Sequence, residues 1–141
     1  MQEFITQRGI KKLLHFTSGK NIDSVKKYGI LSREELERRG WRYSLNDNKR
    51  FDFKLDYISL SISRINDFVC QSFMDQGSLI NLYVIEIDPS VLWKENLNKI
   101  YCETNAATKN ARKGSSLEDL RQCLMILFLI LQAQAKEMCE E

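Results

Sequence analysis

The chain has little proline, little histidine and no closely spaced cysteines, and each shortage excludes a class of protein. One proline and six glycines among 141 residues exclude a collagen-like or low-complexity chain. The four cysteines are scattered without a C-x-x-C pair, which argues against a disulfide framework and against a zinc site. We therefore expect no bound metal, and reduced thiols as in the cytoplasm.

Long hydrophobic stretches are also scarce. Residues Met1–Phe4 show no basic region followed by an apolar one, so we expect no secretory signal. The longest apolar run, Cys123–Leu131, has nine residues, whereas a helix needs about 20 to span a bilayer. With 43% apolar and 28% charged residues, the composition predicts one cytoplasmic globular domain without a membrane partner.

The net charge of +2 conceals an asymmetry. Residues 8–54 hold 13 Lys or Arg against 6 Asp or Glu, a net +7, whereas the rest of the chain holds 8 against 13, a net −5. A basic half suits a polyanionic partner such as nucleic acid. An ordinary solvated cationic face is the alternative.

The apolar pattern predicts short helices and strands without regular β-α-β alternation, which indicates an α+β protein. The strand Leu79–Ile87 is long and largely apolar, so we expect it at the centre of a sheet. The predicted strands are 10–17, 57–63, 79–87 and 99–102, and the predicted helices are 21–28, 34–39 and 66–75, with a helical turn at 105–108.

Capping residues mark where several of these helices begin and end. Ser18 or Asn21 is expected to cap the helix over 21–28, and Gly40 is expected to follow the end of the next one. Asp88 and Pro89 form a typical helix start, with the acid as the cap and proline in the first turn.

The stretch Leu13–Ile22 carries the only histidine of the chain, His15, followed by Thr17 and a turn. A strand, a polar loop and a helix start in succession predict a cleft for an anionic or amide-bearing ligand. An ordinary half-buried histidine at a strand end is the alternative.

Two further segments have patterns suited to a binding site. Residues 41–56 are polar but contain aromatic residues, so we expect this loop to pack over something, as loops that cover a site do. In the strand Tyr57–Ser63, small serines alternate with Ile58, Leu60 and Ile62. The serine face leaves room for a ligand or a close neighbour, although a solvent face is the simpler interpretation.

Between residues 10 and 122 the chain carries an ordered series of short motifs: Leu14–Thr17, Asn21–Ile22, Tyr28–Ser32, Asn46–Asp47, Arg50–Asp52, Leu60–Ser63, Ile87–Trp93, Tyr101–Cys102 and Thr104–Ala107. Together these motifs resemble the DarT family, the NAD-dependent single-stranded-DNA ADP-ribosyltransferases that act as toxins of toxin–antitoxin pairs. Phe16 supports this likeness, because related H-x-T enzymes usually carry glycine between the histidine and the threonine.

The resemblance implies an ADP-ribosyltransferase-like fold, with two small antiparallel sheets around an NAD cleft and flanking short helices. It implies transfer of ADP-ribose from NAD to a thymine or guanine base, and a macrodomain-type antitoxin as partner. Arg50 matches the family's catalytic arginine. The residues that the resemblance assigns to NAD binding are His15, Phe16, Thr17, Ser24, Leu31 and Arg50.

The C-terminal part departs from the family. DarT proteins carry their essential glutamate near the C-terminus, in a stretch resembling Asp-Pro-Gln-Ala-Glu, and no such stretch occurs here. Residues 123–141 form an apolar and then acidic tail, whose apolar run resembles a buried helix or an aggregation-prone segment. We hypothesise a frameshift after Gln122, which leaves 1–122 as an incomplete transferase domain and Glu137, Glu140 and Glu141 as the acids of the tail.

A second hypothesis belongs to a different class. The basic half of the chain fits a nucleic-acid-binding domain without catalytic activity. Binding of NAD separates the two hypotheses, because both predict salt-dependent binding of DNA.

Overall fold

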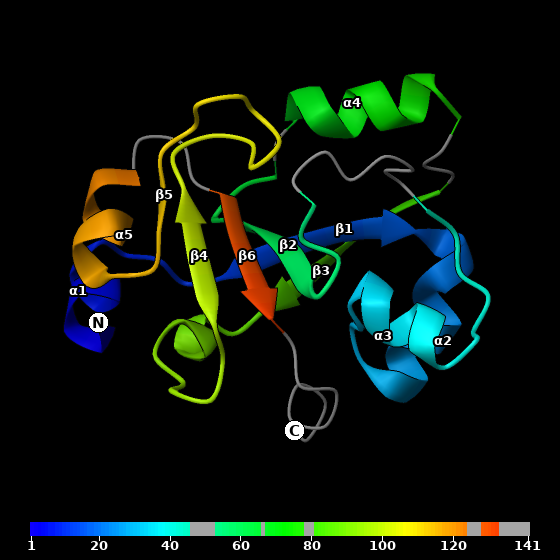
Figure 1. Ribbon diagram of the computed structural model, residues 1–141, viewed down its shortest axis with the longest axis horizontal. Coiled ribbons are helices and arrows are strands. Elements are labelled where there is room, and N and C mark those ends of the chain that lie inside the picture. Colours follow the sequence, from blue (N-terminus) through cyan, green and yellow to red (C-terminus); the bar gives the residue numbers. More distant parts are fainter. Residues whose placement is uncertain (46–52, 66, 78–80, 124–127, 133–141) are drawn as a thin grey trace.

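A computed structural model describes residues 1–45, 53–65, 67–77, 81–123 and 128–132. Within these residues the strands pair throughout in antiparallel fashion, in the order β3-β1-β2-β6-β4-β5 (Figure 1). The strands are β1 (Leu13–Ser18), β2 (Tyr57–Ile62), β3 (Leu82–Ile87), β4 (Lys99–Cys102), β5 (Lys113–Gly114) and β6 (Phe128–Gln132).

Short helices surround the sheet. In Figure 1, α2 and α3 lie together at one end of the molecule, and α1 and α5 lie together at the opposite end. The α-helices are α1 (Gln2–Gln7), α2 (Ile22–Tyr28), α3 (Arg33–Arg38), α4 (Asp67–Asp75) and α5 (Leu117–Cys123), and the 3-10 helices are η1 (Gly19–Asn21) and η2 (Pro89–Leu92).

The sheet consists of two antiparallel parts with a narrow join. β1 pairs with β3 along its whole length, from Leu13 to Ser18. β2, β6, β4 and β5 form the other part. The two parts meet where Leu13 pairs with Ile62 and Leu14 with Ser61. The expected α+β composition and the two small antiparallel sheets with short helices are confirmed, with the refinement that the two sheets are joined at these residue pairs.

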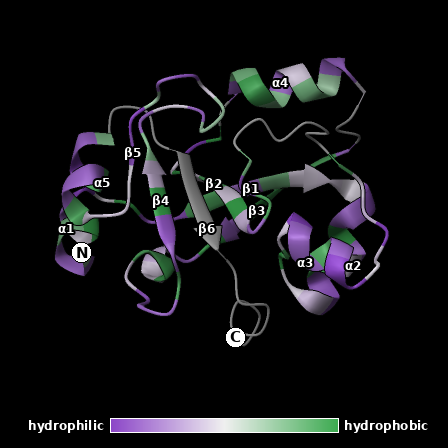
Figure 2. Cartoon of the chain, viewed as in Figure 1, coloured by the Kyte–Doolittle hydropathy of each residue, from purple (hydrophilic) through white to green (hydrophobic). Residues whose placement is uncertain are grey.

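The hydrophobic core lies toward the end of the sheet that carries α1 and α5. Arg121 of α5 lies over the Phe4 ring of α1, at 5.3 Å from its centroid, so the two helices are in contact. In Figure 2, α2 and α3 carry mostly hydrophilic residues. The core cluster comprises Ile5, Ile10, Leu13, Ile30, Ile58, Leu60, Ile62, Val91, Leu92, Leu97, Tyr101, Leu120 and Cys123.

Most of the predicted elements are confirmed. The strand Lys99–Cys102 has the predicted bounds, and α2 and α3 lie within about one residue of theirs. Gly40 adopts a left-handed φ of 65° just after α3, as expected of a residue that ends a helix. The Asp88 carboxylate accepts a hydrogen bond from the Ser90 N–H (2.7 Å) and begins a 3-10 helix with Pro89 in its first turn.

The expectation that the strand Leu79–Ile87 lies at the centre is wrong. Its described part, β3, is the first strand in the order and pairs with β1 alone among the described strands. Tyr83 and Val84 are 50% and 42% exposed. A run of apolar residues indicates a strand, but it does not determine whether that strand lies at the centre or at the edge of a sheet.

The apolar run near the C-terminus also differs from its interpretation as a buried helix. Leu117–Cys123 forms α5, and Phe128–Gln132 forms strand β6, which pairs with β2 on one side and β4 on the other. A short apolar run fits a buried strand as well as a buried helix, because periodicity does not separate the two. Residues 124–127 and 133–141 lie outside the described residues.

Within the described part of the chain, no helix has the length and apolar character needed to cross a membrane. Within the described residues, Cys70, Cys102 and Cys123 form no disulfide, and all three are buried. Burial raises the pKa of Cys70 and of Cys123, which makes these thiols less reactive.

Candidate functional site

A cavity of about 240 Å³ lies where the two parts of the sheet separate. Its wall is formed by β1, α2, α3, β2 and α4, by the loop before β2 and by the turn after β4. The described lining residues are Leu14, His15, Phe16, Thr17, Lys20, Asn21, Ser24, Val25, Gly29, Ile30, Leu31, Arg33, Leu36, Arg42, Tyr43, Ser44, Leu45, Tyr57, Ile58, Ser59, Leu60, Ser61, Val69, Phe73, Asn105, Ala106 and Ala107.

The structure brings the predicted site residues of the described chain together. His15, Phe16 and Thr17 of β1, Ser24 of α2 and Leu31 before α3 all line this one cavity. Arg50, the predicted catalytic residue, lies outside the described residues.

His15 stands at the point where the sheet opens. The pairing of β1 with β2 ends at Leu14 and Ser61, and His15 is the next residue of β1. Its Nδ1 lies 3.0 Å from the carbonyl oxygen of Ser59. Because a carbonyl oxygen only accepts, Nδ1 carries the hydrogen, and in the neutral ring Nε2 is then an acceptor. A side-chain hydrogen bond thus connects the two strands where their backbone pairing stops.

Phe16 and Thr17, the two residues after His15 in β1, make different kinds of contact. Phe16 contacts Phe73 of α4, with ring centroids 6.2 Å apart and planes inclined at 46°. This edge-tilted arrangement is favourable for aromatic pairs and holds α4 against the cavity. Thr17 is only 4% exposed, and its hydroxyl accepts a hydrogen bond from the Asn21 side-chain amide (3.0 Å).

Two serines of β2 line the cavity, and they differ in exposure: Ser59 is exposed and Ser61 is buried. Ser59 and Ser61 both line it, and Ser61 is 3% exposed. The simpler interpretation of this face as a solvent face is therefore wrong at Ser61, whereas Ser59 and Ser63 are exposed as it predicts. Small side chains at these positions leave space between β1 and β2.

The segment 41–45 forms the outer wall of the cavity, and its Arg42, Tyr43, Ser44 and Leu45 line it. The Trp41 N–H donates to the Leu36 carbonyl (3.0 Å) at the end of α3. The Trp41 ring lies 4.4 Å from the Tyr28 ring and 4.8 Å from the Arg39 guanidinium. The expectation that the loop over 41–56 packs over something is confirmed for this segment, and residues 46–52 lie outside the described ones.

Asn21 connects this wall to the strand behind it. Its Oδ1 accepts from the Ser44 N–H (2.8 Å), and its Nδ2 donates to the Ser44 carbonyl (2.9 Å) as well as to the Thr17 hydroxyl (3.0 Å). The predicted capping role is not seen, since neither Asn21 nor Ser18 makes a side-chain capping hydrogen bond. The asparagine is used for tertiary contacts instead, which competes with local capping.

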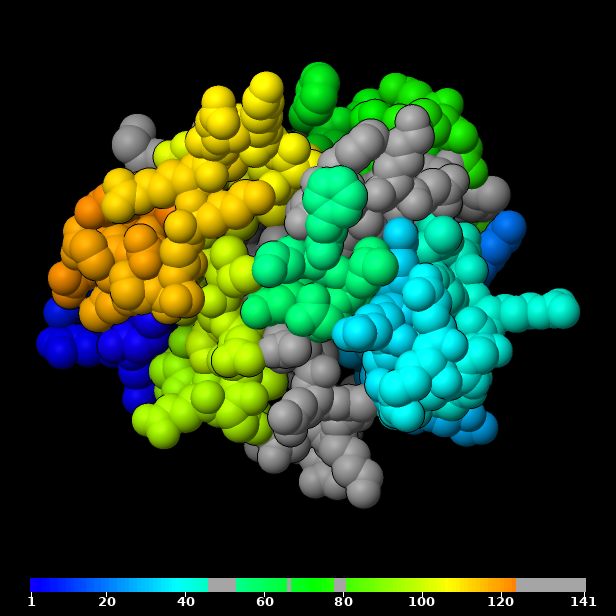
Figure 3. Space-filling model, in the orientation of Figure 1, coloured from blue at the N-terminus to red at the C-terminus, as the bar shows by residue number. Residues whose placement is uncertain are grey.

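Residues 53–57, at the end of the loop, lead into β2 next to the cavity. The segment 53–57 lies on the surface between the α2–α3 region and the residues that follow β4 (Figure 3). The Glu34 N–H of α3 donates to the Leu55 carbonyl (3.0 Å), which attaches this segment to the first turn of the helix. Phe53 has a left-handed φ of 55° and is 83% exposed.

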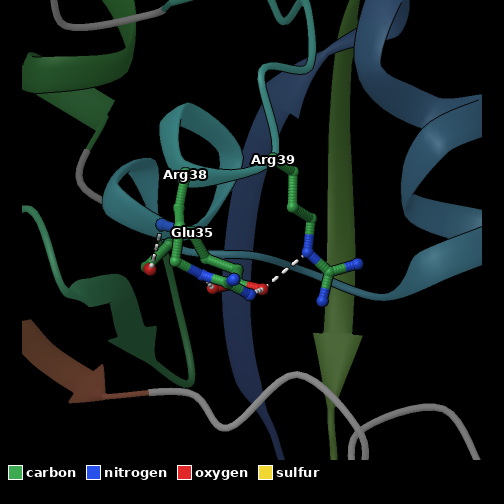
Figure 4. A network of polar contacts seen from close by, with 4 residues as sticks. Glu35, Arg38 and Arg39 are labelled. Carbon is green, nitrogen blue, oxygen red and sulfur yellow. Dashed lines mark hydrogen bonds and ion pairs between the residues drawn. The ribbon is translucent and has the colours of Figure 1, made fainter.

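The electrostatic character of the cavity is positive. Lys20, Arg33 and Arg42 line it, and the described lining residues include no Asp or Glu. On α3, Glu35 binds Arg38 and Arg39 at 2.7 and 2.5 Å (Figure 4). Hydrogen bonds from Arg38 and then from Arg39 lower the pKa of the Glu35 carboxyl to about 2. The Glu35 carboxylate is thus paired with two arginines close to it in sequence.

Several lining residues were not predicted to contact a ligand. Lys20, Arg33 and Arg42 were recognised only as part of a basic half, and Ser44 only as part of a loop. The signal that could have identified Asn21 is its type: an asparagine next to a turn and four residues after Thr17 can satisfy backbone groups of another segment. Its partner Ser44 is 23 residues away, so no local pattern reveals the pair.

Among the described residues no group of three or more His, Cys, Asp or Glu side chains could hold a metal ion. No protein-family model matches the chain, and no curated protein matches it.

Proposed function

We propose that the cavity binds NAD and that the chain has the fold and function of an NAD-dependent mono-ADP-ribosyltransferase that modifies a thymine or guanine base in single-stranded DNA. The observation that carries this proposal is the convergence at one cavity. The residues assigned to NAD by resemblance come from β1, α2 and the segment before α3, and all of those described line it.

The size and charge of the cavity suit one half of the dinucleotide. At about 240 Å³ it is somewhat smaller than typical ligand pockets of about 300–1,000 Å³. It therefore fits nicotinamide and its ribose better than the whole molecule. The cations Lys20, Arg33 and Arg42 then favour the pyrophosphate at the mouth.

The reaction requires orientation and charge stabilisation. The bond between ribose C1′ and the nicotinamide nitrogen breaks, and its electron pair moves to the pyridinium ring. A nitrogen of the DNA base forms the new bond to C1′ and loses its proton. His15, Phe16 and Thr17 would hold the nicotinamide end, and Arg50 would engage NAD and assist deprotonation of the base. The DarT family uses a carboxylate at the ribose of NAD, and no residue of this chain is assigned that role. Binding of NAD and transfer of ADP-ribose are therefore tested separately.

Calorimetric titration with NAD tests the proposal. We expect the wild-type chain to bind, and His15→Ala and Arg50→Ala each to weaken binding about tenfold or more, because each removes a hydrogen-bonding or charged contact. Arg121→Ala, in α5, makes the same truncation as Arg50→Ala at a residue outside the described cavity lining and should bind like wild type. Absence of NAD binding, or affinity unchanged in both cavity variants, would contradict the proposal.

The cationic lining also favours the second hypothesis, a nucleic-acid-binding domain without catalytic activity. Titration with a single-stranded oligonucleotide in the presence and absence of NAD distinguishes the two. DNA binding without any NAD binding would support the second hypothesis, whereas DNA binding together with NAD binding and base modification supports the first.

The proposed frameshift after Gln122 has its own test, the sequence of the encoding DNA beyond that codon. Continuation of the neighbouring frame into an Asp-Pro-Gln-Ala-Glu-like stretch would support an incomplete transferase domain over 1–122. Immediate stop codons in that frame would support a genuine tail, of which Phe128–Gln132 pairs between β2 and β4.

A further inference from the structure

We propose that Asn21 is a positioning residue that makes the Thr17 hydroxyl a hydrogen-bond donor toward the ligand and holds segment 41–45 against the cavity. This inference rests on the proposed function for the identity of the ligand, NAD. The geometry behind it does not, because the three hydrogen bonds of Asn21 exist without a ligand.

The orientation of the Asn21 amide follows from its backbone partner. Ser44 presents an N–H that only donates, 2.8 Å from Oδ1, and a carbonyl that only accepts, 2.9 Å from Nδ2. Rotating the amide by 180° would place donor against donor and acceptor against acceptor. The amide nitrogen therefore faces Ser44 and Thr17, and both of its hydrogens are used.

This orientation determines what Thr17 offers to the cavity. Its Oγ1 accepts a hydrogen from Asn21, so the hydroxyl hydrogen points elsewhere. Thr17 is 4% exposed and lines the cavity, and among the described residues Asn21 is the one side chain bonded to its hydroxyl. A buried hydroxyl with a free hydrogen favours an acceptor atom in the ligand, since an unsatisfied donor is costly. In NAD that acceptor is the carboxamide oxygen of nicotinamide.

The same amide ties two parts of the wall together. Segment 41–45 is 23 residues from Asn21, and both backbone groups of Ser44 are bonded to it. Movement of Ser44 away from the cavity would break two hydrogen bonds and release the nitrogen that orients Thr17. The position of the outer wall and the direction of the Thr17 hydroxyl are thus linked through one side chain.

Asn21→Asp is the informative substitution. A carboxylate still accepts from the Ser44 N–H but cannot donate, so the Thr17 hydroxyl turns its hydrogen toward the carboxylate and away from the ligand. The readout is the ratio of affinities for NAD and for its thionicotinamide analogue, in which sulfur, a weak acceptor, replaces the carboxamide oxygen. The added charge affects both ligands equally, and a merely structural defect would also leave this ratio unchanged.

We expect wild type to prefer NAD over the analogue by about tenfold, and Asn21→Asp to bring the ratio close to one. Thr17→Val should do the same, and adding Asn21→Asp to it should change the ratio no further. Asn110→Asp makes the same charge change at an exposed residue outside the cavity lining and should keep the wild-type ratio. A ratio near one in wild type, or one unaffected by Asn21→Asp, would overturn the inference.

Amide hydrogen exchange at Ser44 tests the tie without any ligand. The Ser44 N–H should be protected in wild type and in Asn110→Asp, and should exchange about tenfold faster in Asn21→Ala, which removes its acceptor. Equal exchange rates in wild type and Asn21→Ala would show that Asn21 does not hold Ser44 against the cavity. If wild type binds neither dinucleotide, the proposed function fails, and the exchange measurement alone decides whether Asn21 holds the wall.

Discussion

The two ends of the sheet are stabilised in different ways. At the α1–α5 end, side chains such as Leu13, Leu92 and Leu120 are fully buried and belong to one apolar cluster. At the α2–α3 end, hydrogen bonds of Asn21 join segments of the cavity wall, and the ion pairs of Glu35 are local contacts with Arg38 and Arg39. Apolar packing fills space, whereas directional polar contacts hold a wall in place and leave space beside it.

This difference separates stability from binding. Burial of apolar surface supplies most of the free energy of folding, so the α1–α5 end should determine whether the chain folds. The polar contacts at the other end contribute less each, and their effect should appear mainly in ligand affinity.

The largest effect on stability is expected at the apolar end. Leu92→Ala removes a side chain with 0% exposure and should lower the free energy of unfolding by about 3 kcal/mol, through lost burial and a remaining void. Leu55→Ala makes the same change at a residue that is 37% exposed and should cost below about 0.5 kcal/mol. Urea unfolding measures both, and similar losses in the two variants would mean that the core is not where the structure places it.

A smaller effect, of opposite sign, is expected within the same core. The Tyr101 hydroxyl is buried and has no hydrogen-bond partner among the described residues. Tyr101→Phe should therefore raise the free energy of unfolding by about 1 kcal/mol. Tyr83→Phe, at a half-exposed residue of β3, serves as the control and should leave stability unchanged.

The same tyrosine gives stability a dependence on alkaline pH. Burial raises the pKa of Tyr101 from 10.0 to about 12. The unfolded chain then loses this proton at a lower pH than the folded one, so stability should fall between about pH 10 and pH 12. Tyr101→Phe should reduce this fall, and an identical alkaline profile in the variant would show that the hydroxyl is not buried.

The smallest effect is expected at the polar end. The Glu35 pKa is lowered from 4.5 to about 2, so its contribution to stability is present above pH 4.5 and is lost as the pH falls toward 2. The ion pairs are exposed, which makes the contribution small. Glu35→Gln should flatten part of the acid profile. Arg38→Gln removes one of the two partners of Glu35 and should shift the loss of stability to higher pH. An unchanged dependence of stability on acid pH in both variants would contradict the ion pairs of Glu35.

Local features were predictable from the sequence, and long-range ones were not. The ends of β4 and the start of η2 follow from turn and capping residues close in sequence, such as Asp88 and Pro89. The edge position of β3 and the strand β6 depend on partners far along the chain. A short apolar run indicates a strand, but its place and its partners in the sheet depend on the whole fold.

The candidate site shows the same division. The motif singles out His15, Phe16 and Thr17, and all three line the cavity, while their role in NAD binding stays a prediction. The hydrogen bonds between Asn21 and Ser44 join residues from separate segments, and Ser61 is buried beside β1, a neighbour that the local pattern of β2 does not reveal. Contacts of this kind need the tertiary structure.

The narrow join between β1 and β2 has a mechanical consequence. Only Leu13 and Leu14 of β1 pair with β2, and beyond them the His15 side chain bonds to the Ser59 carbonyl. A molecule that contacts both strands in the cavity therefore acts as an additional cross-link between two parts of the sheet. A ligand that binds only when the two parts of the sheet are joined stabilises the joined state, and it does so more strongly at higher affinity and concentration. The two parts should therefore become harder to separate as more of the cavity is occupied.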